Sequence, residues 1–250
     1  MMTQIKPFSH QKESNKKLSL AFSLATLTGL AFTVGVNPAQ ALTFTNTVPT
    51  IDIGFMSDSS STSQPRRADN FTLSSQSFGA NLTTIRWSGY YFGTTNLGTD
   101  NFTINILDNS SNKPGTLVAS FSGINSTSAN RTANGTITTA QGTRNRYDFT
   151  YNLSQLLNAN TQYWLSIVDN TPETTTNFYW FGSNSGGDGF STQATSTSSW
   201  QTDSANSAGN LVFSLDYEAV PEPTLILGTL TAGLVGTFMK KKSNSINQKG

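Results

Sequence analysis

Carboxylates are the main side chains of this sequence that could carry out chemistry. The chain has one histidine, His10, and no cysteine among its 250 residues. Without His10, which lies in a leader-like N-terminal segment, the chain cannot form a Ser-His-Asp or Cys-His nucleophile, and it lacks the usual nitrogen and sulfur ligands of zinc. Disulfides are excluded. Only carboxylate or lysine chemistry remains.

Four aspartates lie at the ends of expected strands or in loops, where their oxygens could gather around calcium: Asp100, Asp108, Asp169 and Asp188. No EF-hand spacing is present, and isolated loop aspartates usually cap turns, so we predict neither a bound metal nor a cofactor. A glycoside hydrolase needs two carboxylates about 5 to 10 Å apart across a cleft. The acidic residues scattered between positions 42 and 219 permit such a pair without indicating one, so we expect no enzyme.

Tryptophans are the other candidate site residues, because exposed aromatic rings in binding domains stack on sugar rings. Trp87 and Trp164 fall inside strand patterns and are expected in the core. Trp180 and Trp200 flank a glycine-rich loop, where a core position and a glycan contact both remain open. If the protein has a face that binds extracellular polysaccharide, we predict that these two residues line it.

The elements that must position these residues are strands. Ser, Thr and Asn are the commonest residue types between positions 42 and 219. They compete for backbone hydrogen bonds in helices, whereas Thr and aromatic residues suit strands. Apolar and polar residues alternate in six segments that we predict to be strands, and one short helix is expected at 153–158. The six segments are 82–91, 102–106, 146–153, 163–168, 178–181 and 211–217.

Turn sequences separate the predicted strands. They are found at 112–115, at Asn134-Gly135 and in the glycine-rich stretch 182–189. Many short strands with turns of this kind predict an all-β fold, and we expect an antiparallel sandwich of jelly-roll type.

Charge divides the chain into a mildly acidic middle and two basic ends. Residues 1–41 and 220–250 each carry a net charge of +3, and the whole chain carries +1, so residues 42–219 carry −5. The middle therefore has no basic excess for a polyanion, and we predict no nucleic-acid partner.

Residues 1–41 have the order of a secretory signal peptide. An apolar stretch, 18–36, precedes Ala39-Gln40-Ala41 and follows four lysines: Lys6, Lys12, Lys16 and Lys17. Basic, apolar and small-x-small segments in this order are typical of a cleaved signal. We predict cleavage after Ala41, with Ala39 and Ala41 as the small residues of the site. A retained membrane anchor is the alternative.

Residues 220–250 have the order of a membrane tail. Pro221, Glu222 and Pro223 precede an uncharged apolar run, 224–239, and a basic cluster of Lys240, Lys241 and Lys242. As a helix, the run spans about 24 Å. That is less than the roughly 30 Å of a bilayer core, but lysine stems that reach the headgroups narrow the difference. Because the run has no polar face, we predict a transmembrane helix, with the lysines on the cytoplasmic side.

This order of motif, apolar helix and basic cluster resembles the PEP-CTERM sorting signal of Gram-negative bacteria. The resemblance implies that Pro221, Glu222 and Pro223 are recognised by an exosortase-type membrane protease. The cluster is lysine where the family usually has arginine, and residues 243–250 follow it. Residues 42–219 resemble a module that often precedes such tags, which implies a secreted β-sandwich without an assigned activity. The matching segments are 68–73, 85–91, 99–109, 113–118, 161–171, 178–183 and 211–217.

The sequence thus predicts three parts: a signal peptide (1–41), an extracytoplasmic domain (42–219) and a sorting segment (220–250). The last comprises the motif 220–223, the helix 224–239 and the basic tail 240–250. We expect an exported protein, anchored in the membrane at first and then at the cell surface or outside the cell, with a structural or adhesive role in a polysaccharide matrix. A carbohydrate-binding module is the first alternative, and a carboxylate-dependent polysaccharide hydrolase is the second.

We predict that the mature protein begins at Leu42, because the Ala39-Gln40-Ala41 site follows a basic and apolar leader. N-terminal sequencing of protein recovered from its native cell measures this directly. Protein that begins at Met1 and is found in the membrane fraction would show that the leader is a retained anchor.

Overall fold

The structure, a computed structural model, describes ten stretches of the chain: 41–46, 53–59, 65–75, 79–93, 99–139, 142–172, 176–183, 187–195, 197–202 and 209–220. In these stretches the chain is all-β, with two antiparallel sheets and no helix that is long and apolar enough to cross a membrane. The predictions for Ala39, for Pro221, Glu222 and Pro223, for the helix 224–239 and for the lysines at 240–242 lie outside the described residues.

Sheet A is organised around the long strand β4 (Gly79–Gly93). One edge of β4 pairs with β8 (Gly142–Asn158). The other edge pairs with β14 (Phe213–Val220) as far as Trp87, and then with β10 (Thr176–Ser183) from Gly89 onward. Four further strands complete this eight-stranded sheet. They are β1 (Ala41–Asn46) on β14, β7 (Thr132–Thr139) on β8, and β2 (Ile53–Met56) and β13 (Asn210–Leu211) on β10.

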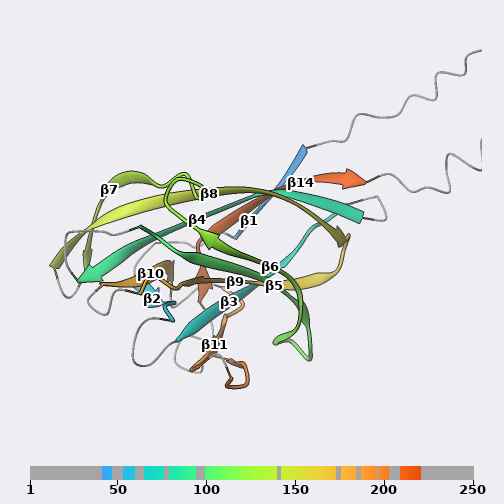
Figure 1. Ribbon diagram of the computed structural model, residues 1–250. Coiled ribbons are helices and arrows are strands. Elements are labelled where there is room, and N and C mark those ends of the chain that lie inside the picture. The colour runs from blue at the N-terminus through green and yellow to red at the C-terminus, as the bar shows by residue number, and fades with distance from the viewer. Residues whose placement is uncertain are drawn as a thin grey trace, which may run out of the picture. The chain divides into compact units, whose positions relative to one another are not determined.

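Sheet B has six strands, and every pairing within it is antiparallel. Their order is β12 (Gln201–Thr202), β11 (Ser191–Gln193), β3 (Arg66–Thr72), β9 (Gln162–Asp169), β5 (Phe102–Asn109) and β6 (Pro114–Ile124). Figure 1 shows the long strands β4 and β8 running together, with β5, β6 and β9 on one side of them.

The two sheets are joined by a core rich in aromatic rings. Trp87 of β4 and Phe149 of β8 stack with centroids 5.1 Å apart and an interplanar angle of 6°. Phe102 of sheet B meets both rings edge-on, at 5.4 Å from Trp87 and 5.1 Å from Phe149. All three side chains are at most 1% exposed. Side chains of both sheets thus meet in one core between the inner faces of the sheets, as expected for a β-sandwich.

All six segments predicted as strands lie in strands, although the last one is interrupted at Val212. The helix predicted at 153–158 is wrong, because these residues continue β8. Their burial alternates with a period of two, and neighbouring Leu156 and Leu157 are 61% and 3% exposed. Alternate residues of a strand point to opposite faces, so one leucine reaches the core and the other meets solvent.

Two turn predictions differ from the structure: one turn lies at a different position, and the other is absent. The turn between β5 and β6 is centred on Ser111 and Asn112, which both have positive φ, and Ser110 and Lys113 exchange two backbone hydrogen bonds across it. Positive φ at both central residues is the geometry of a type I′ hairpin, so Pro114 already begins β6. The turn predicted at Asn134-Gly135 is wrong, because these residues form an irregularity within β7 where the pairing with β8 shifts.

The first and last described strands lie side by side. In the pairing of β1 with β14, Ala41 is opposite Glu218. Strand β14 continues to Val220, just beyond the predicted end of the domain, and Val220 pairs with Gly79 of β4. The chain therefore enters and leaves the sheet at neighbouring positions.

We predict that Leu82→Ala lowers the free energy of unfolding of the full chain by about 3 kcal/mol, because Leu82 is fully buried and its truncation leaves a cavity. The matched control is Leu156→Ala on the neighbouring strand, where the side chain is 61% exposed and the expected change is below about 0.5 kcal/mol. Urea unfolding measures both variants. Equal losses would contradict the assignment of Leu82 to the core.

Candidate functional site

The outer face of sheet A, which points away from sheet B, carries an ordered array of polar side chains. Because Ile85 and Trp87 of β4 point into the core, Arg86 and Ser88 point outward. Arg86 belongs to a transverse row in which each residue is the direct partner of the next. The row runs through Thr45, Ser214, Arg86 and Thr150, on β1, β14, β4 and β8. Neighbouring members lie about 4.8 Å apart, the spacing of paired strands.

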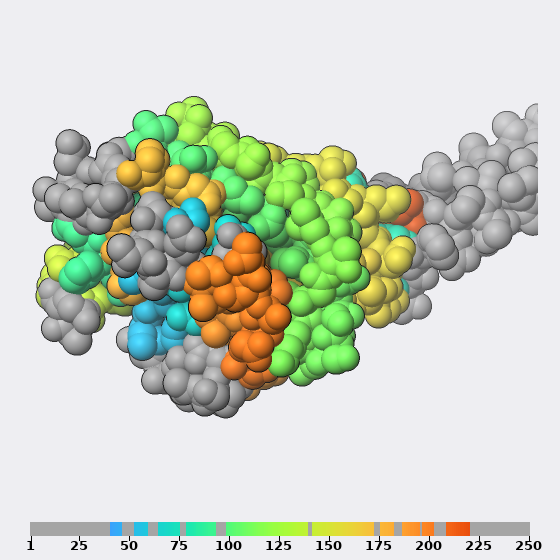
Figure 2. Space-filling model, turned by 60° about the horizontal axis from the view of Figure 1, so that its bottom comes forward, coloured from blue at the N-terminus to red at the C-terminus, as the bar shows by residue number. Residues whose placement is uncertain are grey.

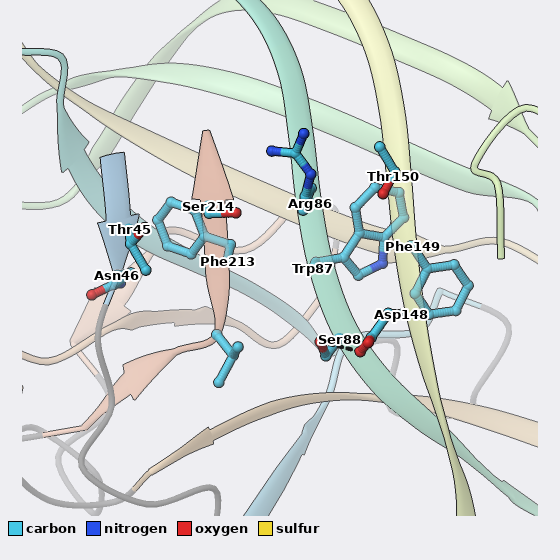
Figure 3. Close-up of a pocket in the computed structure, with 11 residues that line it drawn as sticks. Thr45, Asn46, Arg86, Trp87, Ser88, Asp148, Phe149, Thr150, Phe213 and Ser214 are labelled. Carbon is cyan, nitrogen blue, oxygen red and sulfur yellow. Dashed lines mark hydrogen bonds between the residues drawn. The ribbon is translucent and has the colours of Figure 1, made fainter. Parts of the chain in front are cut away.

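A cavity of about 250 Å³ opens beside this row. The cavity lies where the strand paired with β4 changes. Strand β4 pairs with β14 at Trp87 and with β10 from Gly89. Val212, which connects β13 to β14, also lines it. Figure 3 shows the lining side chains on β1, β14, β4 and β8.

Opposite charges are paired around the cavity. Arg86 Nη2 lies 2.6 Å from Asp216 Oδ2. On the other side, Ser88 Oγ donates a hydrogen bond of 2.6 Å to Asp148 Oδ1, drawn as a dashed line in Figure 3. Arg146 Nη2 is 3.4 Å from the same carboxylate oxygen. This part of the face therefore offers charged donors and acceptors but little net charge.

Hydroxyl groups complete the lining. Thr45 is exposed, and Thr150 and Ser214 are half-buried. Their side chains make no hydrogen bond to other residues in the described part of the chain. Hydroxyls that both donate and accept, next to paired guanidinium and carboxylate groups, suit a ligand that is itself rich in hydroxyls.

Asp216 is poorly suited to act as the acid of a glycoside hydrolase. One acid of a hydrolase pair must stay protonated near neutral pH, so its pKa must be raised. The hydrogen bond from Arg86 instead lowers the pKa of Asp216. Asp216 therefore stays ionised and cannot serve as the general acid.

The outer face continues beyond the cavity into a group of aromatic residues, here called the aromatic end. Tyr90 and Phe92 follow Ser88 on the same face of β4, and they meet Tyr179 and Phe181 of β10. Tyr90 stacks on Tyr179 at 5.1 Å, and Phe92 is 6.2 Å from Tyr179. Burial raises the pKa of Tyr90 to about 12, so its hydroxyl stays neutral.

Two arginines of β8 lie over the aromatic end. Arg144 is 4.9 Å from the centre of the Phe92 ring, and Arg146 is 5.7 Å from that of Phe181. Since Arg146 also approaches Asp148, it connects the aromatic end with the cavity. None of these residues was predicted as a site, although the alternation of Arg86, Ser88 and Tyr90 with core residues is visible in the sequence.

The predicted glycan contact at Trp180 is wrong. Its side chain is 0% exposed, and its Nε1 donates a hydrogen bond of 2.8 Å to the carbonyl of Val212. The prediction failed because Trp180 follows the alternation of β10 into the core. An indole held between the two sheets cannot stack on a sugar.

Trp200 is half-buried and lies on the outer face of sheet B, so it shares no surface with Trp180. It packs against Ala68, Leu107 and Trp164. Figure 2 shows the orange segment that contains β11 and β12 on the surface beside green β6. Trp87 and Trp164 are buried as predicted, at 1% and 3% exposed.

The four aspartates considered as calcium ligands are mostly engaged separately. Asp108 accepts a hydrogen bond from the Thr116 amide, and Asp188 accepts one of 2.8 Å from Asn70 Nδ2. Asp100 is buried and accepts from the Tyr91 hydroxyl at 2.6 Å. In the described stretches, no three or more Asp, Glu, His or Cys side chains are arranged to hold a metal ion.

Asp169 is fully buried at the end of β9. Its Oδ1 accepts a hydrogen bond of 2.6 Å from Thr171 Oγ1, while its Oδ2 is buried without a hydrogen-bond partner. Burial, assisted by the nearby charge of Asp58, raises the pKa of Asp169 to about 6. Burial also raises the pKa of Asp69 well above its ordinary value. These buried carboxyls lie in the interior of the domain, so their effect is on stability.

Comparisons of the chain with protein-family models, with curated proteins and with solved structures find no match. The chemistry of the outer face must therefore be argued from its own side chains.

We predict that the native protein gains stability as the pH falls from about 6 to about 4. The pKa of Asp169 is about 6 in the native state against an ordinary 3.8, so native protein keeps a proton that unfolded protein releases between these values. As the pH rises through this window, Asp169 alone removes up to about 3 kcal/mol from the free energy of unfolding.

Asp169→Asn should be more stable than the parent at pH 7 and should lose the part of this pH dependence that Asp169 contributes, while buried Asp69 keeps its own part. Urea unfolding at pH 4.5 and pH 7 measures both effects. Leu156→Ala, which changes an exposed side chain and no titratable group, is the control and should retain the parent's pH dependence. A parent-like slope in Asp169→Asn would contradict the assignment.

Proposed function

We propose that this chain is an exported protein of the cell surface or extracellular matrix, delivered by an exosortase-type sorting system, with a structural or adhesive role. The observation that carries this proposal is the order of parts in 220–250. Pro221, Glu222 and Pro223 precede an uncharged apolar run, which precedes Lys240, Lys241 and Lys242. A leader with the order of a secretory signal begins the same chain.

The fold supports the proposal by leaving both processing positions outside the core. Ala41, the last residue before the proposed signal cleavage, is exposed at the start of β1. Strand β14 ends at Val220, immediately before Pro221. Removal of either tail would therefore leave the buried residues of the sheets in place. The proposal includes a jelly-roll topology for the β-sandwich.

A non-catalytic role is supported by the chemistry of the described carboxyls. Asp169, Asp69 and Asp100 have raised pKa values but are at most 3% exposed, so no substrate reaches them. Asp216, which pairs with the cavity residue Arg86, has a lowered pKa. Among the described residues we therefore identify no carboxyl that combines a raised pKa with access to the cavity.

A carbohydrate-binding role is the second candidate, and the cavity on the outer face of sheet A favours it. Its lining combines Arg86 and Asp148 with the hydroxyls of Thr45, Thr150 and Ser214. Half-buried Tyr179 and Phe92 lie further along the same face. The two roles are compatible, because a matrix protein can adhere through a glycan site.

We predict that replacing Pro221, Glu222 and Pro223 by alanine changes where the protein is found without unfolding the domain. Because proline restricts the backbone to extended conformations, we expect two prolines around Glu222 to favour presentation of its carboxylate to a protease at the membrane surface. The run 224–239 would still insert, so the variant should stay in the membrane fraction at full mass while the parent is processed. Cell fractionation and mass spectrometry measure this in a host that contains the sorting protease.

The control replaces Ser243, Asn244 and Ser245 by alanine, which alters the same tail behind the lysine cluster, and it should be processed like the parent. If the motif variant and the parent had the same mass and the same distribution, the segment would be only a tail anchor.

A further inference from the structure

Two charged side chains line the cavity, Arg86 and Asp148, and each is paired with an opposite charge just outside the lining. Arg86 donates to Asp216 on one side, while Asp148 accepts from Arg146 and Asn134 on the other. Neighbouring hydroxyls of a sugar ring both donate and accept, so each pair can exchange hydrogen bonds with two of them. Hydrogen bonds to charged groups are about twice as strong as neutral ones, which favours this arrangement in competition with water.

The pairing of charges also indicates which sugars fit. Arg86 is balanced by Asp216, and Arg146 by Asp148. A uronate or sulfated sugar would meet a carboxylate as closely as a guanidinium and would gain little from the charge of this face. A neutral sugar uses both members of each pair, so the geometry favours a neutral ligand.

The outer face is long enough for several sugar units. Arg86, Ser88, Tyr90 and Phe92 alternate along one face of β4, and the strand rise places the first and last about 20 Å apart. At the far end, Tyr179 and Phe92 are half-buried, so part of each ring remains open to solvent. Aromatic rings of this kind stack on the apolar face of a sugar. Between the two ends Ser88 and Tyr90 are buried, at 7% and 4% exposed, so the accessible link is the half-buried Arg146, which approaches both Asp148 and Phe181.

We propose that the outer face of sheet A binds a neutral polysaccharide chain. One sugar ring lies in the cavity between Arg86 and Asp148, and the following units extend along β4 to Tyr179 and Phe92. This inference rests on the proposed function, because the domain must be exported to meet such a chain. It replaces the expected contacts at Trp180 and Trp200 with a site on the opposite side of the sandwich from Trp200.

The test is calorimetric titration of the purified full chain with linear hexasaccharides of glucose, mannose and galactose, and with a hexauronate. We expect at least one neutral hexasaccharide to bind and the hexauronate to bind at least about tenfold more weakly. Arg86→Leu should weaken the binding by about tenfold, as expected when a hydrogen bond to a charged group is lost. Thr150→Met, which fills the cavity without removing any described hydrogen bond, should weaken it by a similar factor.

A pair of serines provides the matched control. Ser88 Oγ donates to Asp148 at 2.6 Å on sheet A, and Ser120 Oγ donates to Asn105 at 2.7 Å on sheet B. Ser88→Ala should weaken binding several-fold, whereas Ser120→Ala should leave it unchanged. Urea unfolding of each variant separates a lost contact from a lost fold, and the Thr150→Met result stands even if Arg86→Leu is unstable.

The proposal is overturned if no neutral hexasaccharide binds, if the hexauronate binds best, or if Arg86→Leu and Thr150→Met bind like the parent. Fractionation of Thr150→Met in the host with the sorting protease separates this outcome from the proposed function. Normal sorting without glycan binding would contradict the proposed glycan site and leave the proposed function standing. Glycan binding without processing at Pro221, Glu222 and Pro223 would contradict the proposed sorting tag and leave the glycan site standing.

Discussion

The stacking of Trp87 on Phe149, with Phe102 edge-on to both, is the contact on which the rest of the structure depends. It fixes β4 against β8 within sheet A and ties sheet B to the pair. The Nε1 of Trp87 is buried here without a hydrogen-bond partner, so the ring is held by packing and not by a polar contact. Because side chains alternate along a strand, Trp87 in the core places Arg86 and Ser88 on the outer face. A register slip by a single position would bury the site and expose the core.

The fold was predictable where apolar residues alternate strongly, as in 82–91 and 163–168. The fold was not predictable where this alternation is weak. Strand β7 (Thr132–Thr139) contains only Ala133 and Ile137 as apolar residues and has no buried residue, so it is held in place by its pairing with β8. At 153–158, leucines at spacings of three and four imitate a helix, yet continued pairing with β4 keeps them extended. In both cases a distant strand decides the local conformation.

The candidate site was less predictable than the fold for the same reason. The sequence identifies residue types, and it led to Trp180 because tryptophans are the usual sugar-stacking residues. Whether a side chain faces the core depends on the register of its strand, which placed Trp180 inside. The row through Thr45, Ser214, Arg86 and Thr150 comes from four separate parts of the chain. No local pattern brings such residues together, although the alternation at 85–91 does predict that Arg86 points outward.

The position of β14 also determines how the domain can fold. This strand lies between β1 and β4, so the last part of the domain to be synthesised forms the interior of sheet A. Phe44, in the first described strand, pairs with Leu215, in the last. Such distant contacts give a high contact order, which slows folding because long loops must close before any contact stabilises them. Sheet A can therefore be completed only after Val220 has been synthesised, and until then β4 keeps one edge unpaired along the stretch that β14 will occupy.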